Sequence, residues 1–392
     1  MSNPAATPED GSRPQARAGN FHNFFWTEPE NCPYIPGPGQ GMITKRMTHR
    51  GGISLRKRDL TRLLIENTVD RALRDMERDA HRSLRNLVDL ALTFSKGTFE
   101  RHFLTLCRSM LENETSPYYQ LLDRALRTCD RQTLKTFGIN VGYEACSKGA
   151  RRIREIEAAQ GFNVPWALTI QAGSQGLSRL YLQRLVTEGT ELGIRVFLLQ
   201  DFQLEQDVLE QLLREHPTCA FVVFTTGARG ADWNLANLAR FPNLLLSVDA
   251  HGPLVLELCR ALEEERMPYA LHLDYSDETA ATLPAQLEEL QPLGSLLVLL
   301  YAQGASPETQ QAVFQQVQNA RTAHSYPFGL MELTQDLLAI DQVVSDDPCS
   351  LTFLADGQAV TPEGPTAANI RSESLTQVLR KTLPKCPRTI ET

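Results

Sequence analysis

The sequence predicts an α/β protein in which an all-helical domain precedes a parallel (β/α) TIM-like barrel, either closed or partial. After Thr136, short apolar runs alternate with amphipathic segments at intervals of about 25 residues. Strands and helices in strict alternation indicate parallel strands that are covered by helices. Before Lys135, apolar residues instead recur every three or four positions, as in packed helices.

Four segments follow from this change of pattern. We expect an irregular or disordered arm over residues 1–52, because this stretch is polar and interrupted by proline and glycine. Residues 53–135 are expected to form a helical domain of about four helices. Residues 136–346 are expected to form the barrel, and residues 347–392 a C-terminal hairpin followed by a helix and a tail.

Each apolar run of the barrel segment is predicted to form one strand. The runs begin at Phe137 (FGINVGY), Trp166 (WALTIQ), Arg195 (RVFLLQ), Phe221 (FVVFTT), Leu244 (LLLSVD), Tyr269 (YALHLD) and Leu296 (LLVLLY). Two segments compete for an eighth strand, PFGLMEL from Pro327 and SLTFLADGQAV from Ser350. Because Asp-Gly is a favoured hairpin turn, we assign the second segment to an appended hairpin around Asp356 and Gly357.

The net charge of −8 is divided unevenly along the chain. The part up to Lys135 carries 21 Lys and Arg against 16 Asp and Glu, and the remainder carries 18 against 31. A basic domain can bind an acidic partner, but the acidic total is expected to repel nucleic acid at long range. We therefore expect the two domains to pack on one another.

Neither a membrane span nor a disulfide framework is predicted. No apolar run approaches the roughly 20 residues that cross a bilayer. The first residues lack the apolar centre of a signal peptide, so we expect a cytoplasmic protein without membrane contacts. The eight cysteines are scattered with no CxxC pair, which argues against a zinc ribbon or secreted disulfides, and we predict no metal site.

Polar residues at the strand ends mark the candidate active site, because sites of β/α barrels lie at the carboxyl ends of the strands. Asp249 and Asp274 each end an apolar strand, His251 follows Asp249, and His272 alternates with Asp274. We predict these four residues as catalytic, in acid–base chemistry or in binding a divalent cation. Strand-end aspartates also cap the following helix, which is the alternative reading. Further polar strand-end residues are Gln171, Gln200, Asp201, Thr225, Thr226, Arg229, Tyr301, Gln303 and Glu332.

The segment WALTIQAGSQGLSRLYLQRLVTEGTELGIRVFLLQ resembles the second β/α unit of radical S-adenosylmethionine enzymes. In that family a Gly-Gly-Glu turn follows the second strand, and Gly173, Ser174 and Gln175 occupy its place, followed by Gly176. VGYEACSKGA lies where the family carries its CxxxCxxC loop, and SLTFLADGQAVTPEG is similar to the family's Asp-Gly hairpin. The resemblance implies a cofactor-binding set of Asn140, Cys146, Gly173, Ser174, Gln175 and Gly176.

The sequence departs from that family at the residues that matter most. A [4Fe-4S] cluster with one open iron needs three thiolates, and only Cys146 stands at the loop. Gln175 replaces the glutamate of the turn. We therefore do not expect a standard cluster, while S-adenosylmethionine stays a candidate ligand because main-chain N–H groups of the 173–176 turn suit a carboxylate.

Two functions remain open. In the first, the barrel is a radical S-adenosylmethionine-like protein without the standard iron–sulfur ligands that binds a small molecule at its C-terminal mouth, with an unknown reaction. In the second, the barrel is catalytically silent and the protein is an accessory that binds a protein partner or nucleic acid through its basic helical domain. Arg56, Lys57 and Arg58 would contribute to this second function.

Overall fold

The computed structural model describes residues 60–385, except residues 77, 96–97, 174–176 and 204. The chain divides into two compact units, Met1–Thr44 and Lys45–Thr392, and every described residue belongs to the second. The predicted arm over residues 1–52 and the basic triplet at 56–58 lie outside the described residues. None of the described helices combines the length and apolar character that a bilayer crossing requires.

Helices α1 (Leu60–Met76), α2 (Ala80–Phe94), α3 (Thr98–Met110), α4 (Pro117–Thr128) and α5 (Arg131–Ile139) form the predicted helical region. The carboxylates of Asp79 and Asp130 cap α2 and α5, each accepting a hydrogen bond from the main-chain N–H three residues later. Val88, Leu111 and Tyr119 form a small core among α2, α4 and the turn that follows α3. Local caps and helical spacing therefore define these elements, as the sequence indicates.

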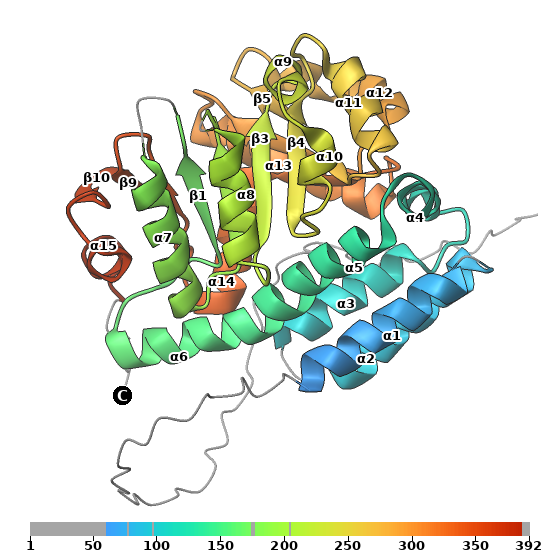
Figure 1. The fold of residues 1–392 in the computed structure, drawn as a ribbon, viewed down its shortest axis with the longest axis horizontal. Coiled ribbons are helices and arrows are strands. Elements are labelled where there is room, and N and C mark those ends of the chain that lie inside the picture. Colours follow the sequence, from blue (N-terminus) through green and yellow to red (C-terminus); the bar gives the residue numbers. More distant parts are fainter. Residues whose placement is uncertain (1–59, 77, 96–97, 174–176, 204, 386–392) are drawn as a thin grey trace, which may run out of the picture. The chain divides into compact units, whose positions relative to one another are not determined.

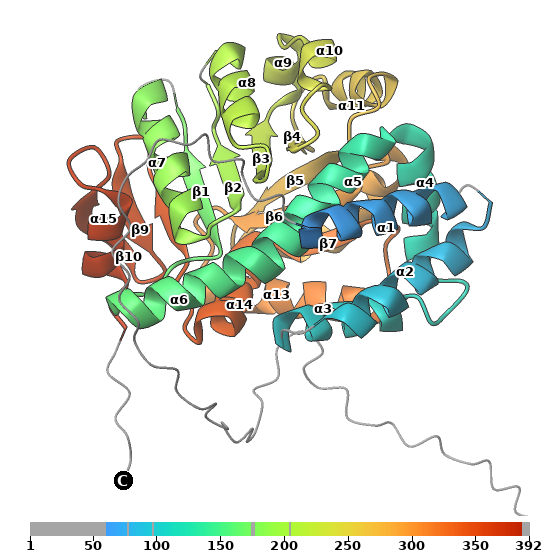
Figure 2. The ribbon, with the colours of Figure 1, turned by 60° about the horizontal axis from the view of Figure 1, so that its bottom comes forward.

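The prediction that FGINVGY forms the first strand is wrong. Residues 131–160 form one run of helix, in which α5 continues into a π-helix, η1 (Asn140–Gly149), and then into α6 (Ala150–Gln160) (Figure 2). Buried residues at Asn140, Glu144, Gly149, Ile153 and Glu157 recur every four or five positions, which is a helical and not an alternating pattern. The predicted domain boundary after residue 135 falls inside this helix.

The other predicted strands are present in one ten-stranded sheet (Figure 1). Its order is β10-β9-β8-β1-β2-β3-β4-β5-β6-β7. The parallel strands are β1 (Ala167–Gln171), β2 (Val196–Gln200), β3 (Ala220–Thr225), β4 (Leu244–Asp249), β5 (Tyr269–Tyr275), β6 (Leu297–Ala302), β7 (Gly329–Glu332) and β8 (Leu351–Phe353). From β1 to β7, strands that follow one another in the sequence are also neighbours in the sheet, as in a β/α barrel. Because β7 is an edge strand and does not pair with β8, the barrel is partial.

Both candidates for the eighth strand belong to the sheet. PFGLMEL contains β7, and SLTFLADGQAV contains β8 together with β9 (Gln358–Thr361). β8 and β9 pair antiparallel around Gly357, whose φ of 87° suits the turn, and β10 (Gly364–Asn369) extends the hairpin. Because β8 also pairs parallel with β1, the hairpin fills a barrel position as well.

Helices follow the strands and cover one face of the sheet. They are α7 (Arg179–Leu192), α8 (Gln206–Glu215), α9 (Gly227–Ala231), α10 (Leu235–Leu238), α11 (Val255–Glu264), η2 (Ala280–Thr282), α12 (Leu283–Leu290), η3 (Gln291–Leu293), α13 (Pro307–Ala323), α14 (Leu333–Ser345) and α15 (Leu375–Thr382). On this covered face, the Tyr269 hydroxyl of β5 donates to Glu263 of α11 at 3.1 Å. Because side chains alternate along a strand, the same face of β5 carries Tyr269, Leu271, Leu273 and Tyr275.

The helical region packs against the amino ends of the strands. The Asn140 amide donates at 2.9 Å to the carbonyl of Cys219, the residue directly before β3. Asp130 donates its main-chain N–H to the carbonyl of Arg266, three residues before β5. Tyr118 of α4 meets His324 at the end of α13. The carboxyl ends of the strands, where a barrel site is expected, therefore lie at the opposite end from these contacts.

Candidate functional site

A polar patch occupies the sheet face opposite to helix α11, at the carboxyl ends of β4, β5 and β6. Asp249 of β4 is the register partner of His272 in β5, and Asp274 is the partner of Tyr301 in β6. His272 and Asp274 are two residues apart on one strand, so their side chains point to the same face. Three neighbouring strands thus bring these four side chains together, and we call this set the mouth patch.

His272 is the buried member of the mouth patch, with 7% of its surface exposed. Its Nδ1 lies 3.1 Å from the Ser247 hydroxyl of β4, and its ring lies 5.0 Å from that of Phe224 in β3. Burial lowers the pKa of His272 to about 4, although the nearby Asp249 and Asp274 carboxylates favour its protonated form. His272 is therefore a neutral imidazole near pH 7, suited to hydrogen bonding.

The two carboxylates of the mouth patch have different surroundings. Asp249 accepts a hydrogen bond from the main-chain N–H of His251 at 2.9 Å, so it holds the turn after β4. Gly252 packs directly on this carboxylate, because a Cβ there would lie 3.0 Å from Oδ2. Asp274 is half-buried and has no hydrogen-bond or ion-pair partner among the described residues. Asp274 is therefore the carboxylate whose hydrogen-bonding capacity the described fold does not use.

Aromatic rings form one side of this region. Phe224 of β3 contacts Tyr301 of β6 edge to face, with 6.4 Å between the ring centroids. Two strands separate β3 from β6, which would place them about 14 Å apart in a flat sheet. The short distance between the rings indicates that the sheet curves around this face. Burial, together with the nearby Asp274 and Asp249 carboxylates, raises the pKa of Tyr301 to about 12, so its hydroxyl keeps its proton.

The predicted catalytic set is brought together in part. Asp249, His272 and Asp274 belong to the mouth patch. His251 is exposed on the turn after β4, and it bonds Asp249 through its main-chain N–H and not through its imidazole. The candidates Gln171 and Gln200 are register partners at the ends of β1 and β2, on the same face as the patch.

The predicted cofactor-binding set is not assembled. Asn140 and Cys146 lie in η1, and Asn140 bonds the amino end of β3, whereas Gly173 follows the carboxyl end of β1. The physical reason is that residues 137–149 form helix instead of a strand and its exit loop. Ser174, Gln175 and Gly176 lie outside the described residues. Gly173 itself packs between Asp201 and Ala355, where a Cβ would lie 3.0 Å from the Asp201 carboxylate.

The six cysteines among the described residues are not arranged to hold an iron–sulfur cluster. Among the residues described, no group of three Cys, His, Asp or Glu side chains is placed to hold a metal. Burial raises the thiol pKa of Cys219, Cys259 and Cys349, which disfavours the thiolate that a cluster requires. Cys146 is buried in η1 and does not stand at the strand ends.

Glu332, another strand-end candidate, belongs to a different polar network. It is fully buried on the helix-covered side, where its Oε1 accepts a hydrogen bond from Tyr275 at 2.7 Å. Arg321 of α13 and Asp336 of α14 form an ion pair beside it, and Asp336 also accepts from the Glu332 main chain. Burial raises the pKa of Glu332 to about 7. This network ties β5 and β7 to their helices and does not reach the mouth patch.

Two contributors were missed by the sequence reasoning. Ser247 and Phe224 contact His272 directly, yet each lies inside an apolar run that we predicted only as a strand, with no role in the site. The available signal for Ser247 was a hydroxyl within LLLSVD two residues before Asp249, which places both on one face of the strand. Phe224 carried no such signal.

Strand order, parallel pairing and the covering helices define the class of protein as a partial β/α barrel with a polar patch at the carboxyl ends of its strands. No protein-family profile matches the chain, and no curated protein matches it. Among solved structures, Streptococcus suis SuiB bound to S-adenosylmethionine is 9% identical with a TM-score of 0.40, over 61% of this chain and 69% of that one.

Two further solved structures show likeness at the same level. The structure of anSMEcpe with bound AdoMet and a peptide is 10% identical with a TM-score of 0.38, over 55% of this chain and 82% of that one. The 3-dehydroquinate dehydratase of Geobacillus kaustophilus is 16% identical with a TM-score of 0.35, over 55% and 91%. The strand order and the parallel pairing define the fold class.

Proposed function

We propose that the mouth patch binds a small organic cation. The observation that supports this most is Asp274, a half-buried carboxylate without a hydrogen-bond or ion-pair partner among the described residues, which lies beside a second carboxylate, Asp249. Two carboxylates at a concave surface create a negative potential that attracts cations. The neighbouring neutral imidazole of His272 adds a hydrogen-bonding group without adding charge.

The aromatic rings suit the same class of ligand. The Phe224 and Tyr301 ring centroids are 6.4 Å apart, and the half-buried Tyr301 is the register partner of Asp274. A cation above an aromatic ring is attracted to its negative face, most strongly where water is excluded. An organic cation is favoured over a divalent metal because no group of three metal-ligating side chains is present among the described residues.

S-adenosylmethionine is the first ligand to examine. It carries a sulfonium and an ammonium group, and the resemblance of residues 166–200 to radical S-adenosylmethionine enzymes suggested it independently. We propose a barrel of that general kind that works without the iron–sulfur cluster, and no reaction is assigned to it.

The test is calorimetric titration of the full chain with S-adenosylmethionine and with spermidine, a cation of unrelated shape. Asp274→Asn keeps the size of the side chain and removes its charge. We expect it to weaken binding about tenfold or more, the effect of losing one charge-assisted hydrogen bond. Asp75→Asn makes the same change at an exposed position of α1 and is the control, with unchanged affinity.

Three outcomes would count against this function. One is that neither cation binds. Another is that Asp75→Asn weakens binding as much as Asp274→Asn does, which would indicate a general effect of net charge. The third is that citrate, an anion, binds as well as the cations. Failure to bind any of these probes would favour the alternative of a silent barrel that acts through a partner.

A further inference from the structure

Ser247 is a buried hydroxyl in the middle of an apolar strand. It is fully buried in β4, and its neighbours across the sheet are Phe224 and Ala270. Its oxygen lies 3.1 Å from Nδ1 of His272, and the described residues offer it no other side-chain or main-chain partner. Among the described residues, the Ser247 hydroxyl therefore forms one hydrogen bond, with Nδ1 of His272. Which of the two atoms donates depends on the tautomer of the imidazole.

The direction follows from what a buried hydroxyl and a neutral imidazole can each tolerate. A hydroxyl that accepts a hydrogen bond but finds no acceptor for its own hydrogen leaves a donor unsatisfied, which costs more than an empty lone pair. When Ser247 donates, Nδ1 of His272 must be unprotonated. In a neutral imidazole the proton then resides on Nε2.

We propose that Ser247 is a positioning residue that holds His272 in the tautomer protonated at Nε2, so that the mouth patch presents one N–H donor beside two carboxylates. This inference rests on the proposed function for its consequence, which concerns the ligand. A ligand that fills the patch is an organic cation that also carries a neutral hydrogen-bond acceptor, such as a carbonyl, a hydroxyl or a ring nitrogen.

The negative charges around His272 favour a neutral hydrogen-bond acceptor on the ligand. No described residue forms a hydrogen bond with Nε2, so a water or, in the occupied patch, the ligand supplies its partner. A negatively charged acceptor would be repelled by Asp249, the register partner of His272, and by Asp274 on the same strand. The cationic group of the ligand is then directed to the carboxylates and the acceptor to His272.

A second arrangement of the His272 proton competes with this one. The main-chain carbonyl of Ser247 also interacts with the ring of His272 and favours a proton there. In that arrangement Nδ1 would carry the hydrogen and donate it to the carbonyl, and the Ser247 hydroxyl would be left without an acceptor among the described residues. The hydroxyl thus distinguishes the two tautomers, and removing it should allow the second.

The experiment is a two-dimensional nitrogen–carbon-bound-proton NMR spectrum of the ligand-free full chain with labelled histidine, recorded near pH 7. His272 is assigned by comparison with His272→Gln. We expect a pyridine-like shift for Nδ1 and a pyrrole-like shift for Nε2. The opposite pattern, with a pyrrole-like Nδ1, overturns the inference.

Three variants test the role of the hydroxyl. Ser247→Ala should move the His272 shifts towards the tautomer protonated at Nδ1, because the residue 247 carbonyl is still there to accept. Ser247→Thr keeps a hydroxyl at this position and should keep the native His272 shifts. Ser345→Ala is the matched control, since it removes another buried hydroxyl, one that donates to Val164, and should leave His272 unchanged. Unaltered His272 shifts in a folded Ser247→Ala protein overturn the positioning role.

These measurements separate the two proposals, because none of them needs a ligand. An Nε2-protonated His272 in a chain that binds neither S-adenosylmethionine nor spermidine would support the role of Ser247 while contradicting the organic-cation function. Binding of a cation to a chain whose His272 is protonated at Nδ1 would do the reverse.

Discussion

Buried polar side chains serve different purposes on the two faces of this sheet. On the helix-covered side, Glu332 is joined to Tyr275 and Gln335 by hydrogen bonds, so its carboxylate is used within the fold. On the opposite face, His272 has one fixed partner and Asp274 has none among the residues described. Side chains whose hydrogen-bonding capacity is unused by the fold are the ones that a ligand can use.

Glu332 should make stability depend on pH. Its pKa is about 7 in the folded chain against an ordinary 4.5, so the folded state keeps the proton where the unfolded state has lost it. Stability from this group is therefore full below about pH 4.5 and declines up to about pH 7, by on the order of 1–3 kcal/mol. Urea unfolding of Glu332→Gln between pH 5 and 7 should show a flatter dependence than the native chain.

The control for this change is Glu278→Gln, which makes the same substitution at an exposed position. It should keep the native slope of unfolding free energy against pH. Equal slopes for the native chain and Glu332→Gln would show that the carboxyl of Glu332 is already ionised at pH 5.

Two glycines should respond in opposite ways to alanine. At Gly227 a Cβ would lie 2.3 Å from the carbonyl oxygen of Pro253, so the loops after β3 and β4 would have to separate. We expect Gly227→Ala to destabilise the chain by about 1–3 kcal/mol. Gly138 is exposed in α5 with nothing near its Cβ position, and Gly138→Ala should stabilise by about 0.5–1 kcal/mol. Thermal unfolding of both variants checks the contrast, and similar changes would contradict it.

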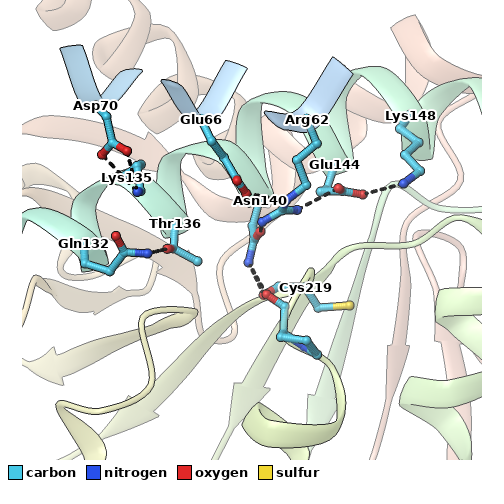
Figure 3. Close-up of polar contacts among 11 residues, drawn as sticks. Arg62, Glu66, Asp70, Gln132, Lys135, Thr136, Asn140, Glu144, Lys148 and Cys219 are labelled. Carbon is cyan, nitrogen blue, oxygen red and sulfur yellow. Dashed lines mark hydrogen bonds and ion pairs between the residues drawn. The ribbon is translucent and has the colours of Figure 1, made fainter. Parts of the chain in front are cut away.

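At the scale of elements, the helix of residues 131–160 is held in place by charged contacts. Arg62 of α1 donates to the fully buried Glu144 of η1 at 2.7 Å and also reaches Asn140 (Figure 3). Lys148 approaches the other Glu144 oxygen at 3.4 Å. A second pair, Lys135 with Asp70 at 2.9 Å, joins α5 to α1 farther along. A π-helix is rarely this long, and these contacts lie along its buried side.

Removing Arg62 should therefore be costly. Arg62→Met keeps much of the apolar stem and leaves the buried Glu144 carboxylate with only part of its compensation, so we expect a loss of about 2–4 kcal/mol. Arg71→Met breaks an exposed pair with Asp75 on the same helix and should change stability by less than about 0.5 kcal/mol. Denaturant unfolding measures both. Partial recovery in Arg62→Met/Glu144→Gln would confirm that the uncompensated charge is the cause.

At the scale of the whole described unit, the helical region and the sheet share contacts at several points. Asn140 donates to the carbonyls of Pro217 and Cys219, and Arg266 donates to the carbonyl of Cys129. Arg154 of α6 reaches the carbonyls at the end of α14. These bonds reach β3, β5 and the last barrel helix, so neither part forms its full set of contacts alone.

We expect the helical region and the barrel to unfold together. Asn140→Leu removes one buried and one partly buried hydrogen bond between them and should lower the stability of both, by about 2 kcal/mol. Hydrogen exchange followed by mass spectrometry should show faster exchange in α1–α5 and in β2–β4 alike. Loss of protection confined to the helices would mean that the two parts are independent cooperative units.

Much of this fold could be predicted from sequence because its elements are locally encoded. Apolar runs bounded by amphipathic helices determined the strands of the runs that begin at Trp166 and end with the run from Leu296, together with their parallel arrangement. Asp356-Gly357 determined the hairpin, whereas the strand in PFGLMEL was one of two candidates for the eighth position. The strand ends also pointed to Asp249, His272 and Asp274, because alternation and the carboxyl-end rule need no knowledge of distant contacts. Sequence alone was enough where one strand, one helix or one turn carried the information.

The tertiary structure alone decided the conformation of FGINVGY and the contacts of Ser247 and Phe224. In each case the reason is that residues distant in the sequence determine the outcome. FGINVGY suits a strand or a buried helix equally well by composition, and its contacts with β3 and α1 select the helix. This choice separates Asn140 and Cys146 from Gly173. Ser247 and Phe224 contact His272 because the sheet register brings β3, β4 and β5 together, and no local sequence pattern contains this information.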